Sequence, residues 1–297
     1  MIGDWVYING KMQPKEAATV SVFDHGFIYG DGVFEGVAVV SGGIFMLDAH
    51  IDRLVESARY LAIASPRRDA LVAAAVETMA RNELRDGYLR IVLTRGSGPV
   101  GIRNMHQLSG PTLVMMTQQE GRERRKAAYE QGLKATLSAL RRIPAQSLDA
   151  KAKTCNYVNN ILAYLEAQAA GADTAIMQDI EGYLAECYAA NIFLVKDGVV
   201  RTPALGSILN GITRQTVLQL CDDLGLACDE TRLTTHDLFC ADEVFETGSL
   251  AELKPICSVS GRTIGSGVPG PITRQLHRAL RALMESGKRS TPIPVRA

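Results

Sequence analysis

A polar, charged segment over residues 118–130 (QQEGRERRKAAYE) divides the 297-residue chain into two runs, each with its own strand and helix patterns. Exposed polar segments are where domain boundaries fall, and a chain of this length has room for more than one core. We therefore predict two domains, 1–118 and 132–297, joined by a linker over 119–131. The basic run at 122–126 could bind anions, but its polar surroundings favour a solvated linker.

Strand and helix patterns alternate along both runs, which predicts a mixed α/β (α/β or α+β) fold. Period-2 or short apolar runs predict strands over 5–8, 34–40, 44–47, 88–94, 112–116, 175–178, 183–185 and 192–195. Helical spacing predicts helices over 70–84, 158–170, 213–224 and 271–285, and one that Asp48 caps and that continues to Leu61. In the strand 88–94, Tyr88 and Arg90 lie on the same face.

The composition argues against several function classes. Lys+Arg and Asp+Glu are both 32, so nothing favours nucleic acid or an anionic membrane as a partner. There is neither an apolar run of about 20 residues nor a signal-peptide pattern. The six cysteines are scattered, which suggests reduced thiols in a cytoplasmic protein. The five histidines lack ligand spacing, so we expect no metal site.

A glycine pattern near the end of the chain matches the dinucleotide fingerprint only superficially. The stretch 265–270 (GSGVPG) has the form G-x-G-x-x-G, but a binding site needs a core strand before it and an acidic residue about 20 positions later. Pro269 and Pro271 crowd the turn. A glycine turn before the last helix is the better interpretation.

The stretch 151–160 (KAKTCNYVNN) places Lys153 just before a predicted helix, with the Tyr157 hydroxyl four residues later. A lysine amine that becomes neutral can form a Schiff base. Considered alone, Lys153 is better explained as a surface lysine beside a loop. Asn159 and Asn160 follow at the start of the same helix.

Three further stretches hold groups that suit one cofactor. Glu186 interrupts an apolar pair of strands, where a carboxylate needs a cationic partner such as a protonated pyridine. Two stretches offer backbone N–H groups and a hydroxyl that could bind an anion. One is the start of a predicted helix, at Gly211, Ile212 and Thr213, and the other follows an apolar strand, at Gly248 and Ser249. Each stretch alone has an ordinary structural explanation. Together, an amine, an acid and two anion cradles are the parts of a pyridoxal phosphate site.

The chain resembles the fold-type IV pyridoxal-phosphate aminotransferases, a family with branched-chain aminotransferases, D-amino acid aminotransferases and aminodeoxychorismate lyases. The resemblance runs from about Trp5 to the last helix. The stretches that carry it are FDHGFIYGDGVFEG, LDAHIDRLVESA, YLRIVLTRG, KTCNYVNNILA, ECYAANIFLVKDG, LNGITR, ADEVFETGSLAE and GPITRQL. The resemblance implies a small N-terminal α/β domain and a larger C-terminal pseudo-barrel domain that binds pyridoxal 5'-phosphate.

The resemblance also implies a role for each site residue. Lys153 would be the catalytic Schiff-base lysine and proton shuttle. Tyr157 would bind the phenolic oxygen of the cofactor, and Glu186 its pyridine nitrogen. The phosphate would be held by Arg53, Gly211, Ile212, Thr213, Gly248 and Ser249, while Leu209 would pack on the ring.

Substrate choice is less constrained by the resemblance. Tyr88 and Arg90 match the Y-x-R motif of branched-chain enzymes, where these side chains bind the substrate α-carboxylate. The resemblance also implies that Tyr29, Phe34, Ile102, Ser249, Leu250 and Ala251 bind the substrate. It further implies a homodimer, in which Tyr29 and the loop 98–104 would reach the active site of the second subunit.

The family activity implied is transfer of an amino group between a branched-chain or hydrophobic L-amino acid and 2-oxoglutarate or another 2-oxo acid. A D-amino acid or (R)-amine transaminase, or an aminodeoxychorismate lyase, is the alternative within the same fold. Leu250, Arg95 and the turn at 187–190 depart from the usual pattern and leave the substrate open. A non-catalytic cofactor-binding protein is a different class, and the presence of Lys153 and Glu186 argues against it.

Overall fold

The computed structural model describes residues 2–119 and 129–294, which form two compact units. The described residues of the first unit are 2–119, 152–156 and 283–294, and those of the second are 129–151 and 157–282. The domain boundaries at 118 and 132 stay a prediction, and the units differ from them because the lysine segment and the C-terminal strand join the first unit. Most of the predicted linker, with its basic run, falls on residues 120–128, outside the described residues.

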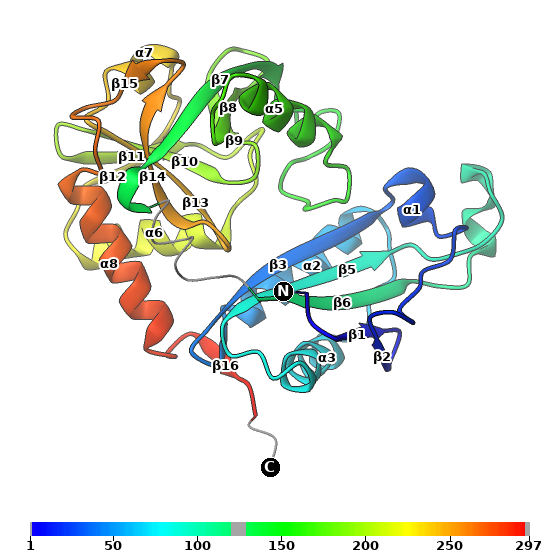
Figure 1. Cartoon of the computed structure of the whole chain (residues 1–297). Coiled ribbons are helices and arrows are strands. Elements are labelled where there is room, and N and C mark those ends of the chain that lie inside the picture. Colours follow the sequence, from blue (N-terminus) through cyan, green and yellow to red (C-terminus); the bar gives the residue numbers. More distant parts are fainter. Residues whose placement is uncertain (1, 120–128, 295–297) are drawn as a thin grey trace. The chain divides into compact units, whose positions relative to one another are not determined.

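The first unit is built on a seven-stranded antiparallel sheet in the order β16-β4-β3-β5-β6-β1-β2 (Figure 1). Its strands are β1 (Trp5–Ile8), β2 (Lys11–Pro14), β3 (Gly32–Val40), β4 (Gly43–Phe45), β5 (Gly87–Thr94), β6 (Thr112–Gln118) and β16 (Ser290–Pro292). Its helices are α1 (His25–Tyr29), α2 (Leu47–Tyr60), α3 (Arg68–Arg81) and the 3-10 helix η1 (Ile102–Gln107).

Helices α2 and α3 bury their apolar stripes against this sheet. On α2, Ile51 and Leu54 are fully buried, and so are Leu89, Ile91 and Leu93 of β5. These three strand residues alternate with Tyr88, Arg90 and Val92, so the predicted division of the two faces of the strand is confirmed. The opposite face of β3 and β5 is thereby left for polar and aromatic side chains.

The second unit contains a mixed sheet in the order β12-β11-β10-β13-β14-β7-β8-β9, with β15 paired to β14 (Figure 1). Its strands are β7 (Leu133–Arg141), β8 (Thr174–Gln178), β9 (Leu184–Cys187), β10 (Asn191–Lys196), β11 (Val199–Pro203), β12 (Cys228–Thr231), β13 (Glu243–Gly248), β14 (Glu252–Val259) and β15 (Arg262–Thr263). Its helices are α5 (Val158–Ala169), α6 (Ile212–Asp223), α7 (Thr235–Phe239) and α8 (Pro271–Glu285). The mixed α/β fold is therefore confirmed.

Two details at the start of α2 differ from the prediction. The strand expected over 44–47 ends at Phe45, and Leu47 is already helical. The helix starts after Met46, whose left-handed backbone (φ 54°) makes the sharp turn without a side-chain cap. Asp48 does not cap the helix, because it lies in its first turn and accepts a hydrogen bond from Arg68 Nη2 at 2.7 Å.

The glycine stretch 265–270 forms the turn before α8, as interpreted from the sequence. The carboxylate of Glu243 accepts hydrogen bonds from the backbone N–H groups of Ile272 (3.1 Å) and Thr273 (2.7 Å). A Cβ on Gly270 would lie 2.0 Å from the Glu243 carboxyl carbon, so this position needs glycine. The protein's own carboxylate thus occupies the place where a bound phosphate would sit in a dinucleotide fold.

In the part of the chain that the structure describes, no helix is both long and apolar enough to cross a bilayer.

Glu246 is one of several buried carboxyl groups in the second unit. Glu246 on β13 is 6% exposed and accepts a hydrogen bond from Thr174 Oγ1 at 2.9 Å. Burial raises the pKa of Glu246, and the nearby charge of Lys254 only partly offsets this. The neutral acid is therefore the form that suits the fold.

We expect Glu246→Gln to make the free energy of unfolding less sensitive to rising pH. Because the folded-state pKa lies above the unfolded value of 4.5, the stability that Glu246 contributes is present below pH 4.5 and is lost as pH rises through the folded pKa. The variant should gain stability over the wild type across that window, by up to about 1.4 kcal/mol per pH unit. Urea unfolding between pH 5 and pH 8 measures the difference. A difference that stays constant with pH would contradict the prediction.

Candidate active site

The segment that carries Lys153 is fixed to the first unit by its main chain. It lies beside β3, where Phe34 N donates to Lys153 O at 3.0 Å and Cys155 N donates to Gly32 O at 2.8 Å. From the other side, Lys153 N donates to the Ser57 hydroxyl of α2 at 3.0 Å. Ser57 is only 2% exposed. Three hydrogen bonds thus fix the backbone from which the amine extends.

Four predicted site residues lie together on the polar face of β3 and β5. The Lys153 Nζ lies 4.5 Å from the centroid of the Phe34 ring, and the guanidinium carbon of Arg90 lies 4.4 Å from it. The same guanidinium is 5.3 Å from the centroid of the Tyr88 ring. Cations are attracted to aromatic faces at these distances. An amine and a guanidinium therefore both lie against one apolar ring.

Arg53, the predicted phosphate ligand, is held by a buried carboxylate. Its Nε and Nη2 donate to the two oxygens of Glu35 at 2.7 and 2.8 Å, and Glu35 is fully buried in β3. His50, one helical turn before Arg53, donates from Nδ1 to Glu35 at 2.7 Å. Burial is the largest single effect and opposes ionisation of Glu35, but the Arg53 charge, the His50 ring and the hydrogen bonds from both residues together outweigh it and lower the pKa of Glu35 to about 2. Burial lowers the pKa of His50, so its ring is neutral and Arg53 supplies the countercharge.

Arg95, which the sequence left without a place, is a structural residue. Its guanidinium binds both oxygens of Asp31, with Nη2 at 2.9 Å, and also donates to the carbonyls of Leu61 and Ala62 after α2. It therefore links the end of α2 to the start of β3. These contacts do not include the residues around Arg90.

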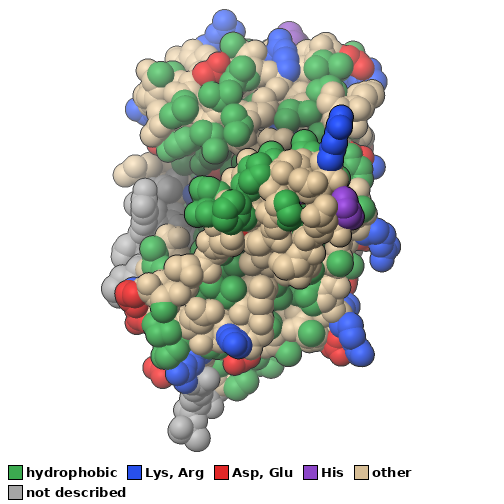
Figure 2. Space-filling model, turned by 90° about the vertical axis from the view of Figure 1, so that its right-hand side faces the viewer, with side chains coloured by type: hydrophobic (Ala, Val, Ile, Leu, Met, Phe, Trp, Pro, Cys, Tyr) green, Lys and Arg blue, Asp and Glu red, His purple; other side chains and the backbone are tan. Residues whose placement is uncertain are grey.

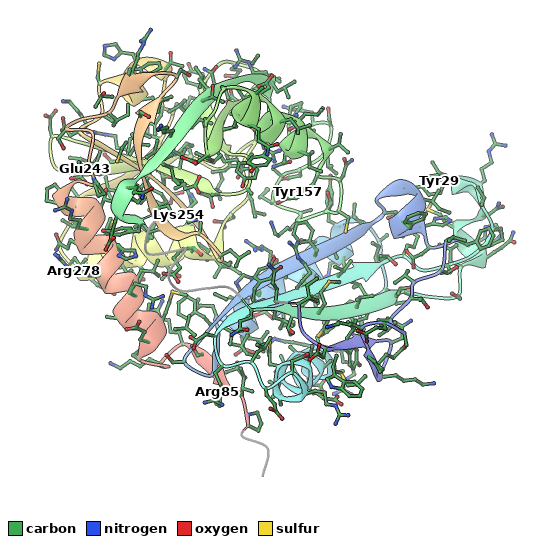
Figure 3. The ribbon with its side chains drawn as sticks, viewed as in Figure 1. Tyr29, Arg85, Tyr157, Glu243, Lys254 and Arg278 are labelled. Carbon is green, nitrogen blue, oxygen red and sulfur yellow. The ribbon has the colours of Figure 1, made fainter. Side chains whose placement is uncertain are left out.

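Tyr29 and Ile102 lie at the end of α1 and at the start of η1. Tyr29, the last residue of α1, accepts a hydrogen bond at its hydroxyl from Gly101 N at 3.0 Å (Figure 3). Its ring packs edge-on against the buried His25. Ile102 begins η1 and is 63% exposed. The contact fixes the loop 98–104 to α1.

In the second unit, Glu186 on β9 receives donors at both carboxylate oxygens. Arg142 Nη2 lies 3.0 Å from Oε1. Leu209 N donates to Oε2 at 3.0 Å, and Asn191 Nδ2 donates to the same oxygen at 3.3 Å. Glu186 is 5% exposed. The structure thus brings together Glu186 and Leu209, two residues predicted to contact the cofactor ring.

The start of α6 is suited to an anion. Gly211 is its N-cap, with extended backbone, and among the described residues no side chain caps this terminus. By contrast, the carboxylate of Glu243 binds the first N–H groups of α8. Ile212 and Thr213 begin the helix, and its first turn contains no acidic residue. A Cβ on Gly211 would lie 2.1 Å from Asn191 Oδ1, so only glycine allows this close approach.

The other predicted residues of the second unit lie in turns or at helix ends. Gly248 ends β13, and Ser249, Leu250 and Ala251 form the turn to β14, each partly exposed. Tyr157 is the N-cap residue of α5 and is partly exposed (Figure 3). The turn 188–190 joins β9 to β10, with Cys187 N donating to Ala190 O at 2.7 Å.

Sequence reasoning missed the residues that hold these groups in place, which are Ser57, Arg142 and Asn191. Glu35, which was noted only as part of a motif, carried a usable signal, because it is a charged residue inside the apolar run of β3. The same signal identified Glu186. Arg142 and Ser57 lie in ordinary polar surroundings in the sequence and give no such signal.

The residues present match the chemistry of pyridoxal 5'-phosphate. An uncapped helix terminus and an arginine suit a phosphate, a buried carboxylate suits a protonated ring nitrogen, and a lysine amine suits an aldehyde. Once bound, this cofactor supplies an electron-accepting ring that makes an amino acid Cα–H bond acidic.

Comparisons with known proteins agree with this chemistry. Residues 32–259 match the family model described as amino-transferase class IV. A Methanocaldococcus jannaschii protein, provisionally named a branched-chain-amino-acid aminotransferase, is 41% identical over 91% of this chain and 93% of its own length. The D-alanine aminotransferase of Bacillus licheniformis is 34% identical over 93% of this chain and 95% of its own length.

Solved structures give the same result. The T.th. branched-chain amino acid aminotransferase with pyridoxamine 5'-phosphate superimposes with a TM-score of 0.94 at 33% identity, covering 98% of this chain and 99% of that chain. Other structures of that enzyme hold N-(5'-phosphopyridoxyl)-L-glutamate and 4-methylvaleric acid, at TM-scores of 0.92. The family model spans most of the chain, and both curated relatives exceed 30% identity. This chain belongs to the class IV aminotransferases and uses pyridoxal 5'-phosphate.

Proposed function

We propose that this aminotransferase moves the amino group of a branched-chain or other hydrophobic L-amino acid to 2-oxoglutarate or another 2-oxo acid. The observation that carries the proposal is the cluster on β3 and β5, where Lys153 and Arg90 both contact the Phe34 ring. An amino acid with an apolar side chain needs an amine to exchange with, a cation for its carboxylate and apolar surface. The cluster offers all three.

The proposed roles divide into holding the cofactor and moving a proton. Lys153 Nζ would bind the cofactor aldehyde and later take the proton from substrate Cα. Glu186 would keep a proton on the ring nitrogen, and Tyr157 would hydrogen-bond the phenolic oxygen. The phosphate ligands would be Arg53 and the cradle formed by Gly211, Ile212, Thr213, Gly248 and Ser249, while Leu209 would pack against the ring.

The substrate would be held by its carboxylate and by its side chain. Tyr88 and Arg90, on one face of β5, supply a hydroxyl and a guanidinium for the carboxylate. Backbone N–H groups of the turn at Ser249, Leu250 and Ala251 would complete this subsite. Phe34, Tyr29 and Ile102 would supply apolar surface for the side chain.

A D-amino acid substrate is the second candidate. It is supported by the 34% identity to the B. licheniformis D-alanine aminotransferase, which is within a few points of the identity to the T.th. branched-chain enzyme. An (R)-amine transaminase or an aminodeoxychorismate lyase shares the fold but lacks such a match among the comparisons above. The configuration at the substrate Cα, L or D, distinguishes the two leading candidates.

We also propose that the protein works as a homodimer. Large apolar side chains are exposed on α1 and around η1, among them Phe27 at 75% and Ile102 at 63%. Figure 2 shows patches of hydrophobic side chains on the face that it draws. A second set, Val158, Ile161, Leu162 and Leu165, follows helical spacing along α5 and is 46–61% exposed. Contiguous exposed apolar surface marks interaction sites. A second copy of the chain is the occupant that the predicted role of Tyr29 requires.

A cytoplasmic location is proposed from the cysteines. All six are free thiols in the structure, and reduced thiols persist in a reducing compartment. Small-molecule amino acids and 2-oxo acids are the proposed partners, with no nucleic acid or membrane among them.

Lys153→Ala should abolish the yellow absorbance that a lysine gives with the cofactor and lower transamination by at least about 10²-fold, since a general acid–base group is lost. Lys151→Ala is the matched control, because Lys151 is exposed and contacts Asp149. The control should keep both the colour and the activity. A Lys153→Ala protein that still holds the cofactor covalently after borohydride reduction would move the Schiff base to another lysine.

A panel of single amino donors tests the substrate. We expect L-leucine to bleach the absorbance of the purified holoenzyme much faster than D-alanine or (R)-1-phenylethylamine. Faster bleaching by D-alanine would replace the L-amino acid proposal with the second candidate, while the family and cofactor assignments would stand.

In the same assay, Arg90→Ala should raise KM for L-leucine about 10- to 100-fold, as expected for loss of a charged hydrogen bond. It should change KM for (R)-1-phenylethylamine, which has no carboxylate, much less. Arg95→Ala is the control, because Arg95 contacts Asp31 and backbone carbonyls. It should leave the ratio of the two KM values unchanged. Equal effects of Arg90→Ala on both donors would remove Arg90 from carboxylate binding.

Phe27→Glu and Ile161→Glu should each shift the protein from dimer to monomer in light-scattering measurements, because a charge cannot be buried in an apolar interface without cost. Val268→Glu changes a side chain of similar exposure, 57%, in the turn before α8 and should leave the dimer intact. A wild-type protein that elutes as a monomer would refute the dimer directly.

A further inference from the structure

Two asparagines at the start of α5 have a clear structural use that the proposed roles do not include. Asn159 Oδ1 and Asn160 Oδ1 both accept hydrogen bonds from Arg142 Nη1, at 3.1 and 3.0 Å. Each amide is oriented by a second bond, since Asn159 Nδ2 donates to Arg141 O at 3.0 Å and Asn160 Nδ2 donates to Tyr188 O at 2.6 Å. The two carbonyl oxygens therefore point at the guanidinium and fix its plane.

The other end of that guanidinium contacts Glu186. Arg142 Nη2 is 3.0 Å from Glu186 Oε1, while Leu209 N and Asn191 Nδ2 bind the second oxygen. Arg142 is 8% exposed and Glu186 is 5% exposed. At this burial an isolated carboxylate is costly, and the guanidinium supplies the opposite charge beside Glu186.

Stability alone explains this pair poorly. Arg142 Nε is buried and has no hydrogen-bond partner in the described part of the chain, so burial of the guanidinium is incompletely compensated. Apolar residues of similar size often stabilise a core at least as well as a buried ion pair does. The arrangement instead gives Glu186 a fixed direction and a fixed charge.

We propose that Arg142, oriented by Asn159 and Asn160, is a positioning residue that keeps Glu186 ionised and aimed at the ring nitrogen of the cofactor. This inference rests on the proposed role of Glu186. It predicts that Arg142 affects only the part of cofactor binding that involves the ring nitrogen.

The test compares two ligands of the cofactor-free protein. One is pyridoxal 5'-phosphate, and the other is its 1-deaza analogue, in which a C–H group replaces the ring nitrogen. Quenching of protein fluorescence gives both affinities. The ratio of the two affinities isolates the ring-nitrogen contact, because the phosphate, the aldehyde and the ring shape are shared.

Arg142→Met should lower the affinity for pyridoxal 5'-phosphate about 10- to 100-fold, the usual size of one charge-assisted hydrogen bond, and leave the analogue nearly unaffected. Arg142→Lys, which keeps the charge but not the planar fork, should recover part of the affinity.

A double-mutant cycle shows whether Arg142 acts through Glu186. Glu186→Gln should lower the affinity ratio by itself, and adding Arg142→Met should lower it little further, because both variants remove the same interaction. Arg214→Met is the matched control, since Arg214 is a buried arginine that contacts Glu230 and Pro203 O. It should leave the ratio unchanged.

The outcomes separate this inference from the proposed function. If Glu186→Gln lowers the ratio and Arg142→Met does not, the positioning role of Arg142 is wrong while Glu186 keeps its role. If Glu186→Gln leaves the ratio unchanged, Glu186 does not contact the ring nitrogen and both ideas fail. Should Arg142→Met not fold, Asn159→Ala removes one acceptor from a partly exposed position and should lower the ratio about two- to fivefold; an unchanged ratio would overturn the inference.

Discussion

The buried carboxylate of Glu35 joins the two elements on which the catalytic half of the first unit depends. It lies inside β3, an otherwise apolar strand, and can be ionised there only because α2 supplies Arg53 and His50. That pairing fixes the rotation of α2 against β3. Ser57, one turn further along the same helix face, then lies where it accepts the N–H of Lys153, so the lysine backbone is fixed by the same helix and strand that the ion pair holds together.

The candidate site residues of each unit include a buried arginine–carboxylate pair. The arginine and the carboxylate have opposite roles in the two pairs. In the first unit the carboxylate, Glu35, orients an arginine that we assign to the cofactor phosphate. In the second unit the arginine, Arg142, orients a carboxylate that we assign to the ring nitrogen. A charge that faces a ligand must be held in place before the ligand arrives, and in a dry environment an opposite charge both holds it and offsets part of its desolvation cost.

The sequence predicted the parts of the fold that follow from local patterns. The alternation of β5 and the helical spacing of α5, α6 and α8 gave elements within two residues of the observed bounds. β7 was missed because alanines weaken the alternation of Leu133, Ala135 and Leu137. The start of α2 was misplaced because the turn depends on the left-handed backbone of Met46, a conformation that methionine rarely adopts.

The candidate site was predictable where a residue type is unusual for its position. A charge within an apolar strand identified Glu186, and the ordered family motifs identified Lys153 and Arg53. Arg142 and Ser57 were not predictable, because the need for them arises only after folding brings a carboxylate and a backbone N–H near them. The same limit applied to Arg95, whose partners Asp31, Leu61 and Ala62 are contacted only through the tertiary fold.

The start of α6 also depends on contacts that form only in the folded chain, but here those contacts exclude a side chain from the helix terminus. Asp24 caps α1, Thr234 caps α7 in a capping box, and Glu243 binds the first N–H groups of α8. In these three helices, side-chain oxygens of the protein accept hydrogen bonds from backbone N–H groups at the N-terminus. The N-cap of α6 is instead a glycine, and it must be, because Asn191 occupies the space that a side chain would need. Asn191 also donates to Glu186, so the residue that excludes a cap from α6 helps to hold the carboxylate assigned to the other end of the cofactor.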